Sequence, residues 1–362
     1  MINFEQFTLK NGLKVIVHKD DSTPIVAFNL LYDVGARDEK ESQTGFAHLF
    51  EHLMFGGSEN IPSFDGPLQE VGGENNAFTS NDITNYYITL PKQNLETAFW
   101  LESDRMKSLA FTDKSLEVQR SVVIEEFKQR YLNQPYGDVW LKLRPLTYQK
   151  HPYRWPTIGK EISHIEEATM DDVKSFFARH YLPNNAVMVV AGNVTVKEVK
   201  ALSQKWFGDI PAGDRPVRSL PAEPVQVTKR VLDIQANVPS DGLYMAFHMP
   251  GRMDESYYST DLLSDILGRG KSSRLYNELV EDKKVFHGLN AYVMGSVDPG
   301  LLMIEGKLSD GVNLAEAEES IWELLKKFKT ESFSENELIK VKNKAESTLV
   351  FSEVELLNRA MN

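Results

Sequence analysis

Apolar and polar positions alternate along residues 4–18, in two runs separated by Asn11-Gly12. Alternation predicts strands and the Asn-Gly step predicts a tight turn, so we expect a β-hairpin here. Residues 24–32 form another apolar strand, and residues 44–55 then switch to helical spacing and end at Gly56-Gly57, which is typical of a helix C-terminus. The pattern also predicts strands at 75–79, 84–90 and 186–191, and helices at 92–109, 114–131, 169–180 and 195–207.

A segment rich in proline and glycine interrupts this pattern in the middle of the chain. It contains Gly208, Pro211, Gly213, Pro216, Pro221 and Pro224. Such composition is typical of a connection between domains, and 362 residues are enough for two domains. We therefore predict an N-terminal half at 1–210, a linker at 211–228 and a C-terminal half at 229–362.

The order of elements repeats after the linker. The second half reads as strands at 229–236, 242–248 and 300–307 and helices at 256–267 and 312–328. Asn76-Ala77-Phe78 in the first half has a counterpart in Asn290-Ala291-Tyr292. Loose alignments of α+β segments are common, but the shared order favours a duplication. We predict an α+β fold of two homologous halves, each a mostly antiparallel sheet backed by helices. The second half has no counterpart of residues 164–207 and is expected to be truncated.

Composition narrows the function classes. The formal net charge of −12 makes nucleic acid an unexpected partner, and no apolar run approaches the roughly 20 residues of a membrane helix. The first 20 residues lack the pattern of a secretory signal, so we expect a cytoplasmic protein, or an exported one if a signal has been removed. Because the chain has no cysteine, any metal must be held by histidine and carboxylate.

The segment His48-Leu49-Phe50-Glu51-His52 lies within the predicted helix 44–55. His48 and His52 are one turn apart on one face, so both imidazoles can reach a cation at about 2.0–2.1 Å. Glu51 lies beside that face, where it can take a proton from water without being a ligand. Two unrelated histidines are the ordinary alternative, but burying them beside a carboxylate without a metal would be unfavourable. We therefore predict one Zn²⁺ per chain, two ligands and a general base from this helix, and a third ligand from elsewhere.

The third ligand is expected to be a carboxylate on a second helix packed against the first. The strongest candidates are Glu125 and Glu126, which follow the apolar run Val122-Val123-Ile124. At least one of the two must point toward the core. Glu117 and Glu102 are weaker candidates, and periodicity alone does not choose among the four.

The sequence resembles the pitrilysin/insulinase family of zinc peptidases with the inverted His-x-x-Glu-His motif, the inverzincins, and in particular its bacterial members similar to processing peptidases. Most of the chain takes part in the resemblance. The segments that carry it are 45–57 around the motif, Gly72 to Thr79, Val122 to Glu126, His151 to Gly159, and Leu267 to Tyr276.

The resemblance implies a zinc endopeptidase that hydrolyses peptides or unfolded protein segments inside a chamber closed by the two halves. It assigns the ligands His48, His52 and Glu126 and the general base Glu51. It also implies that a substrate adds as an extra strand along an edge strand beside the metal. That strand comprises Asn75, Asn76, Ala77, Phe78 and Thr79.

One departure from the family pattern concerns partners. Relatives whose second half completes the site carry an Arg and, seven residues later, a Tyr, where this chain has Val280 and His287. We therefore expect this chain to be the zinc-bearing subunit of a homo- or heterodimer, in which a related subunit supplies the Arg/Tyr pair.

Two other functions remain open at this point. A structural or chaperone-like member of the same fold would bind no metal, although loss of activity usually shows as decay of the motif. A non-proteolytic protein could use the two histidines and one glutamate for iron. In that protein Glu51 would have no assigned role.

Overall fold

The computed structural model describes residues 2–362, which form two compact units. The first unit runs to Thr228 and takes in Ser352–Asn362, and the second is Lys229–Phe351. Relative to the predicted boundaries, the last eleven residues thus belong with the first unit. The predicted linker 211–228 also contacts the first unit, because the guanidinium of Arg218 pairs with Asp33 and Asp38.

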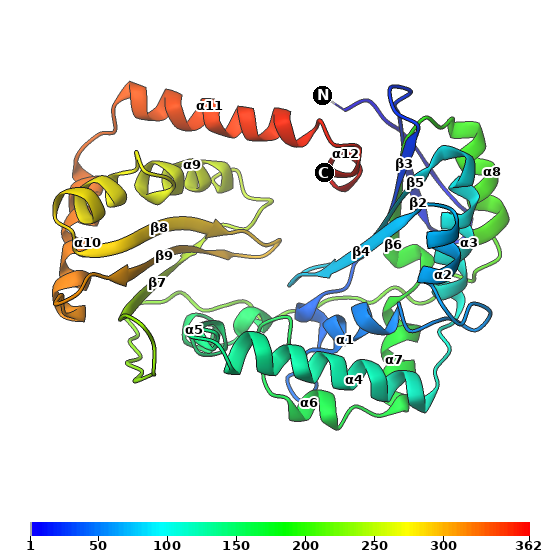
Figure 1. Cartoon of the computed structure of the whole chain (residues 1–362), viewed down its shortest axis with the longest axis horizontal. Coiled ribbons are helices and arrows are strands. Elements are labelled where there is room, and N and C mark those ends of the chain that lie inside the picture. Colours follow the sequence, from blue (N-terminus) through cyan, green and yellow to red (C-terminus); the bar gives the residue numbers. More distant parts are fainter. Residues whose placement is uncertain (1) are drawn as a thin grey trace. The chain divides into compact units, whose positions relative to one another are not determined.

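The first unit contains a six-stranded sheet in the order β1-β2-β6-β3-β5-β4 (Figure 1). Every neighbouring pair is antiparallel except β2 and β6, which are parallel. The order places β4 at one edge. The strands are β1 (Glu5–Thr8), β2 (Lys14–Lys19), β3 (Ile25–Tyr32), β4 (Glu74–Thr79), β5 (Thr84–Pro91) and β6 (Ala186–Gly192).

Local sequence explains the first hairpin and the two faces of the sheet. Gly12, in the turn between β1 and β2, has φ +88°, a conformation that favours glycine. Along β3, Phe28 belongs to the large core that includes helix α3 (Leu95–Lys107), whereas Ala27 lies in a small cluster with Ala360 of the C-terminal helix α12 (Leu356–Met361). Successive side chains of a strand point to opposite faces of the sheet, so different helices cover the two faces.

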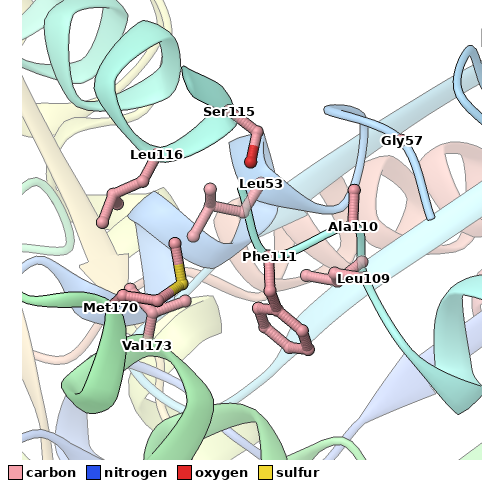
Figure 2. Close-up of a pocket in the computed structure, with 9 residues that line it drawn as sticks. All are labelled: Leu53, Gly57, Leu109, Ala110, Phe111, Ser115, Leu116, Met170 and Val173. Carbon is pink, nitrogen blue, oxygen red and sulfur yellow. The ribbon is translucent and has the colours of Figure 1, made fainter. Parts of the chain in front are cut away.

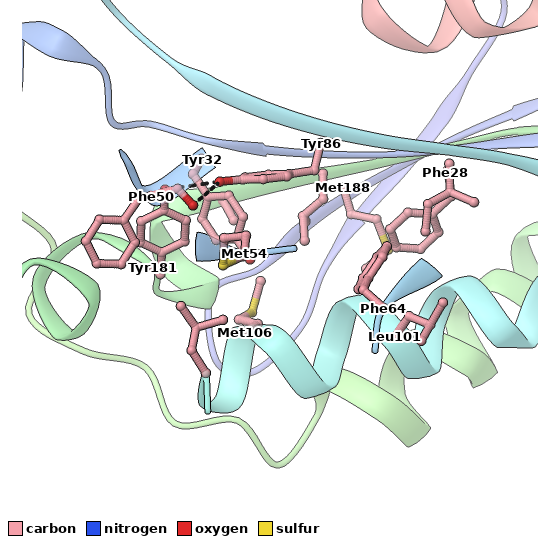
Figure 3. Close-up of a cluster of buried hydrophobic side chains, with 14 of the residues drawn as sticks. Phe28, Tyr32, Phe50, Met54, Phe64, Tyr86, Leu101, Met106, Tyr181 and Met188 are labelled. Carbon is pink, nitrogen blue, oxygen red and sulfur yellow. Dashed lines mark hydrogen bonds between the residues drawn. The ribbon is translucent and has the colours of Figure 1, made fainter. Parts of the chain in front are cut away.

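The first unit also contains helices. They are α1 (Phe46–Leu53), α2 (Asp65–Glu70), α3 (Leu95–Lys107), α4 (Asp113–Phe127), α5 (Val139–Thr147), α6 (Ser163–Glu166), α7 (Met170–His180) and α8 (Val196–Phe207). Of these, α1, α2 and α3 contact the sheet directly. Figure 3 shows how α1 is fixed to the sheet: the Tyr86 hydroxyl donates to the carbonyl of Phe50 at 3.4 Å and lies 3.3 Å from the Tyr181 hydroxyl. In residues 2–362 no helix is long and apolar enough to cross a membrane.

The second unit contains a three-stranded antiparallel sheet in the order β7-β9-β8. Its core joins side chains of β8, β9, α9 and α10. A longer helix, α11, is linked to the unit by the ion pair between Arg274 and Glu337. The elements are β7 (Gly242–Met249), α9 (Tyr257–Gly268), β8 (Phe286–Met294), β9 (Gly300–Leu308), α10 (Leu314–Thr330) and α11 (Glu335–Ser352).

The two units share a topology, which confirms the prediction of an α+β fold with two related halves. In the first unit β3 pairs with β5 and β5 with β4, α1 lies between β3 and β4 in sequence, and α3 follows β5. In the second unit β7, β9, β8, α9 and α10 stand in the same relations. The matching tripeptides lie at corresponding places, in β4 and β8.

One predicted strand is wrong. Residues 229–236 lie in no strand, and Val231, Leu232 and Ile234 are exposed. Alternation makes a segment compatible with a sheet, but a strand also needs a neighbour that satisfies its backbone groups. In the part of the chain that the structure describes, residues 229–236 belong to neither sheet.

Burial of His180 is expected to make the stability of the first unit depend on pH. Its side chain packs 4.6 Å from the ring of Phe176, and burial lowers its pKa to about 4. Because the unfolded chain takes up the proton near pH 6.5, stability is present above that pH and is lost as pH falls toward 4, by up to about 1.4 kcal/mol per pH unit. We expect His180→Gln to flatten this acid limb in chemical denaturation of the metal-free protein. An unchanged slope in the variant would contradict the assignment.

Candidate metal centre

Helix α1 presents the two histidines of the motif on one face. Its other faces are buried through Phe46, Leu49 and Phe50, which holds the helix in one rotational setting. The rings of His48 and His52 lie with their centroids 4.9 Å apart. The i, i+4 spacing therefore brings the two imidazoles together, as expected from the helical period.

Helix α4 brings a carboxylate to these imidazoles. The Oε2 atom of Glu126 lies 3.7 Å from His48 Nε2 and 3.4 Å from His52 Nε2. Two ligand atoms at about 2.1 Å from a tetrahedral zinc ion would be about 3.4 Å apart, so the three side chains fit such an ion. Within residues 2–362 they are the one group of three His, Cys, Asp or Glu side chains whose ligand atoms converge, all within 4.8 Å. We call these three residues the metal cluster.

The other candidate carboxylates lie elsewhere. Glu125 is exposed and accepts a hydrogen bond from Gln129, and Glu117 pairs with Arg120. Glu102 is fully buried in an ion pair with Arg105. The structure therefore brings only Glu126 of the four to the histidines.

The electrostatics of the metal cluster suit a cation. Burial lowers the pKa of His48 to about 4, so its imidazole is neutral near pH 7, which is the form that binds a metal. A hydrogen bond from His52, together with His48 and Arg130, lowers the pKa of Glu126 below its usual value and keeps it ionised. Arg130 binds Oε1 of Glu126 at 2.9 Å, which directs Oε2 toward the histidines. Sequence reasoning missed Arg130, although its i, i+4 spacing from Glu126 was a usable signal.

Glu51 lies beside the metal cluster and is oriented by β4. Its Oε2 atom accepts a 2.6 Å hydrogen bond from the Thr79 hydroxyl. Burial raises the pKa of Glu51, and the bond from Thr79 opposes this shift. Thr79, predicted as part of a substrate-binding strand, thus also holds a carboxylate of the motif helix, a contact that the sequence did not indicate.

The segment Asn75–Thr79 forms most of the edge strand β4. Its side chains alternate between partly buried and exposed positions, and Phe78 is exposed. The backbone N–H of Ala77 is bonded to the side chain of its neighbour Asn76 at 2.8 Å. An edge strand of this kind can accept another extended chain.

A small apolar cavity lies close to the C-terminal end of α1, but it is distinct from the metal cluster (Figure 2). Its lining contains no histidine or carboxylate. The lining residues are Leu53, Gly57, Leu109, Ala110, Phe111, Ser115, Leu116, Met170 and Val173. The cavity therefore offers no group for acid–base or metal chemistry.

Two family models match the chain. Residues 14–160 match the model described as insulinase, peptidase family M16, and residues 167–345 match the model of the peptidase M16 inactive domain. The metal cluster lies wholly within the first match.

The relatives carry consistent names. The chain is 32% identical to the zinc protease PqqE of Helicobacter pylori over 346 residues, which cover 93% of this chain and 77% of the relative. It is 27% identical to the uncharacterized zinc protease YmxG of Bacillus subtilis, over 96% of this chain and 84% of the relative. The crystal structure of a protease from Helicobacter pylori superimposes with a TM-score of 0.92 at 29% identity, covering 99% of this chain and 88% of that chain.

These similarities define the class as that of a peptidase. The chain belongs to the insulinase family, peptidase family M16.

Proposed function

We propose that this chain is a zinc metalloendopeptidase of the inverzincin type, which hydrolyses peptides or unfolded protein segments. The observation that carries the proposal is the convergence of His48, His52 and Glu126, with Glu51 adjacent in the same helix. Two imidazoles and one carboxylate are a ligand set of catalytic zinc sites, and they leave one position open. The names of the relatives add zinc as the metal.

The residues of the chain have separate tasks in this reaction. When bound, one zinc ion would polarise the peptide carbonyl and make water a better nucleophile at neutral pH. Glu51 is held by Thr79 through Oε2, which leaves Oε1 to take the proton of the attacking water and pass it to the leaving amine. Arg130 keeps Glu126 ionised and oriented.

The edge strand β4 supports recognition of extended chains. A substrate added beside Asn75–Thr79 would bond through its backbone, so selection by sequence would be weak. The side chain of Asn76, which occupies the N–H of Ala77, would give way to a substrate carbonyl. In a folded protein most extended segments are already paired or packed, so unfolded segments are the expected substrates in the proposed closed chamber.

The second unit supports the proposal of a partner subunit. Val280 packs beside the core of that unit, and His287 is exposed with Nε2 3.9 Å from Asp310. Val280 cannot donate a hydrogen bond to a substrate. We propose a homo- or heterodimer, as in a processing peptidase, in which a related subunit supplies the Arg/Tyr pair.

The test compares one sequence in two states. A quenched fluorescent peptide and a folded protein that contains the same peptide are incubated with the zinc-loaded chain. We expect cleavage of the free peptide alone, loss of that cleavage with a chelator, and recovery on adding zinc. Cleavage that a chelator does not reduce would contradict the proposed chemistry.

The partner has its own readout in the same assay. We expect a low rate from the isolated chain and a large gain on adding a related subunit that carries the Arg/Tyr pair. Full activity of the isolated chain would contradict the partner proposal and leave the zinc chemistry intact.

A further inference from the structure

Helix α1 begins without a side-chain cap of its own. Its N-cap residue is Gly45, in the left-handed region with φ +87°. A Cβ atom there would lie 2.7 Å from the carbonyl oxygen of Ile158, so serine, threonine or aspartate cannot take this position without a shift of the backbone. The first N–H groups of a helix have no acceptor within the helix and need a partner from elsewhere.

Glu39 supplies that partner. Its Oε2 accepts from the N–H of Gly45 at 2.9 Å, and its Oε1 accepts from the N–H of Ala47 at 2.8 Å. The side chain is only 8% exposed. Ala47 directly precedes His48, so the Glu39 carboxyl hydrogen-bonds the backbone next to a member of the metal cluster.

The turn that carries Glu39 is itself held in place. The indole N–H of Trp155 donates to the carbonyl of Ala36 at 2.9 Å, at the start of the 3₁₀ turn Ala36–Asp38. Glu39 therefore holds the N-terminus of α1 in a defined position.

Burial makes the ionised form of this capping carboxyl unfavourable. It raises the pKa of Glu39 to about 8, although the two N–H groups and Trp155 oppose the shift. Strongly perturbed carboxyls concentrate at functional sites. An exposed cap would satisfy the same N–H groups without this penalty, which favours a role beyond helix stability.

We propose that Glu39 is a positioning residue for the metal cluster: by gripping the first turn of α1, it sets His48 and His52 at the correct distance from Glu126 on α4. This inference rests on the proposed zinc site. Glu39 touches neither metal nor substrate, and it acts through the backbone of α1. A small displacement of α1 would change both distances between the histidines and Glu126.

The experiment compares Glu39→Gln with the matched control Asp265→Asn. Gln keeps the size of the side chain and one acceptor oxygen, but it places an amide donor against one of the N–H groups. Asp265 is also buried, at 6% exposure, but it pairs with Arg269 in the second unit. Zinc affinity is measured by chelator competition, and the geometry of the ligands by the visible spectrum of the Co²⁺-loaded protein.

We expect Glu39→Gln to weaken zinc binding by about tenfold, as loss of an outer partner does at other metal sites, and to alter the Co²⁺ spectrum. It should lower kcat with little change in KM, because β4 is untouched. Asp265→Asn should keep both the zinc affinity and the spectrum of the wild type. If Glu39→Gln does not fold, Glu39→Asp retains the carboxyl group but is one methylene shorter, and the same changes are expected.

Two results would contradict the positioning role of Glu39. A variant that binds zinc with wild-type affinity and spectrum, even if it melts at a lower temperature, would show that Glu39 is a structural cap alone. A wild-type chain that binds no zinc would overturn the proposed function itself, and the positioning role with it.

Discussion

Replacing Glu51 with glutamine is expected to lower kcat for peptide cleavage by about 1,000-fold and to leave one zinc ion bound per chain. Glutamine has nearly the same size, and its amide oxygen can still accept the hydrogen bond from Thr79. It cannot take a proton from water, and proton transfer by a positioned side chain contributes about 10²–10⁴-fold to the rate. Zinc content by mass spectrometry and peptide cleavage by fluorescence are measured on the same preparation.

A matched control is Glu41→Gln, which removes an exposed carboxylate that pairs with Arg154. We expect this variant to retain wild-type activity. If Glu51→Gln kept its activity within about twofold, the general base would be a different group. If it lost zinc together with activity, Glu51 would be needed for metal binding and its role as a base would be unsupported.

Replacing Glu126 with glutamine is expected to weaken zinc binding by more than about 100-fold, because loss of an outer partner of a ligand alone costs about 10–100-fold. Glutamine removes the negative charge of the carboxylate whose Oε2 lies 3.7 Å from His48 Nε2 and 3.4 Å from His52 Nε2. Glu125→Gln is the matched control, because it changes the neighbouring carboxylate, which points to solvent. Zinc affinity is measured by chelator competition for the two variants side by side.

The pair of variants also tests the register of α4. Zinc affinity equal to that of the wild type in both variants would mean that neither carboxylate is a ligand. A larger loss in Glu125→Gln would mean that α4 is rotated by about one residue, or about 100°, from the described structure.

Local periodicity predicted most elements because each carries its signal in its own residues. Helix α1 is an example: the spacing of its apolar residues and the glycines after it identify the helix, and the helix identifies the histidine pair. The choice between Glu125 and Glu126 was not decidable in the same way. It depends on how α4 is rotated against α1, and Val123 and Phe127, buried on either side of this pair, set that rotation.

Features that depend on distant partners were not predictable from local pattern. Residues 229–236 alternate as a strand does but lie in no sheet. The position of β4 at a sheet edge follows from the strand order, which joins segments far apart in the sequence. The grip of Glu39 on α1 also depends on the fold, since an acidic residue six positions before a glycine has no local signature.

The most direct test of the metal centre is a crystal of the zinc-loaded protein with anomalous diffraction data collected at the zinc edge. We expect one strong peak in the first unit, at about 2.0–2.2 Å from His48 Nε2, His52 Nε2 and a carboxylate oxygen of Glu126. Zinc bound by other residues, or no peak at the metal cluster, would contradict the assignment of this site.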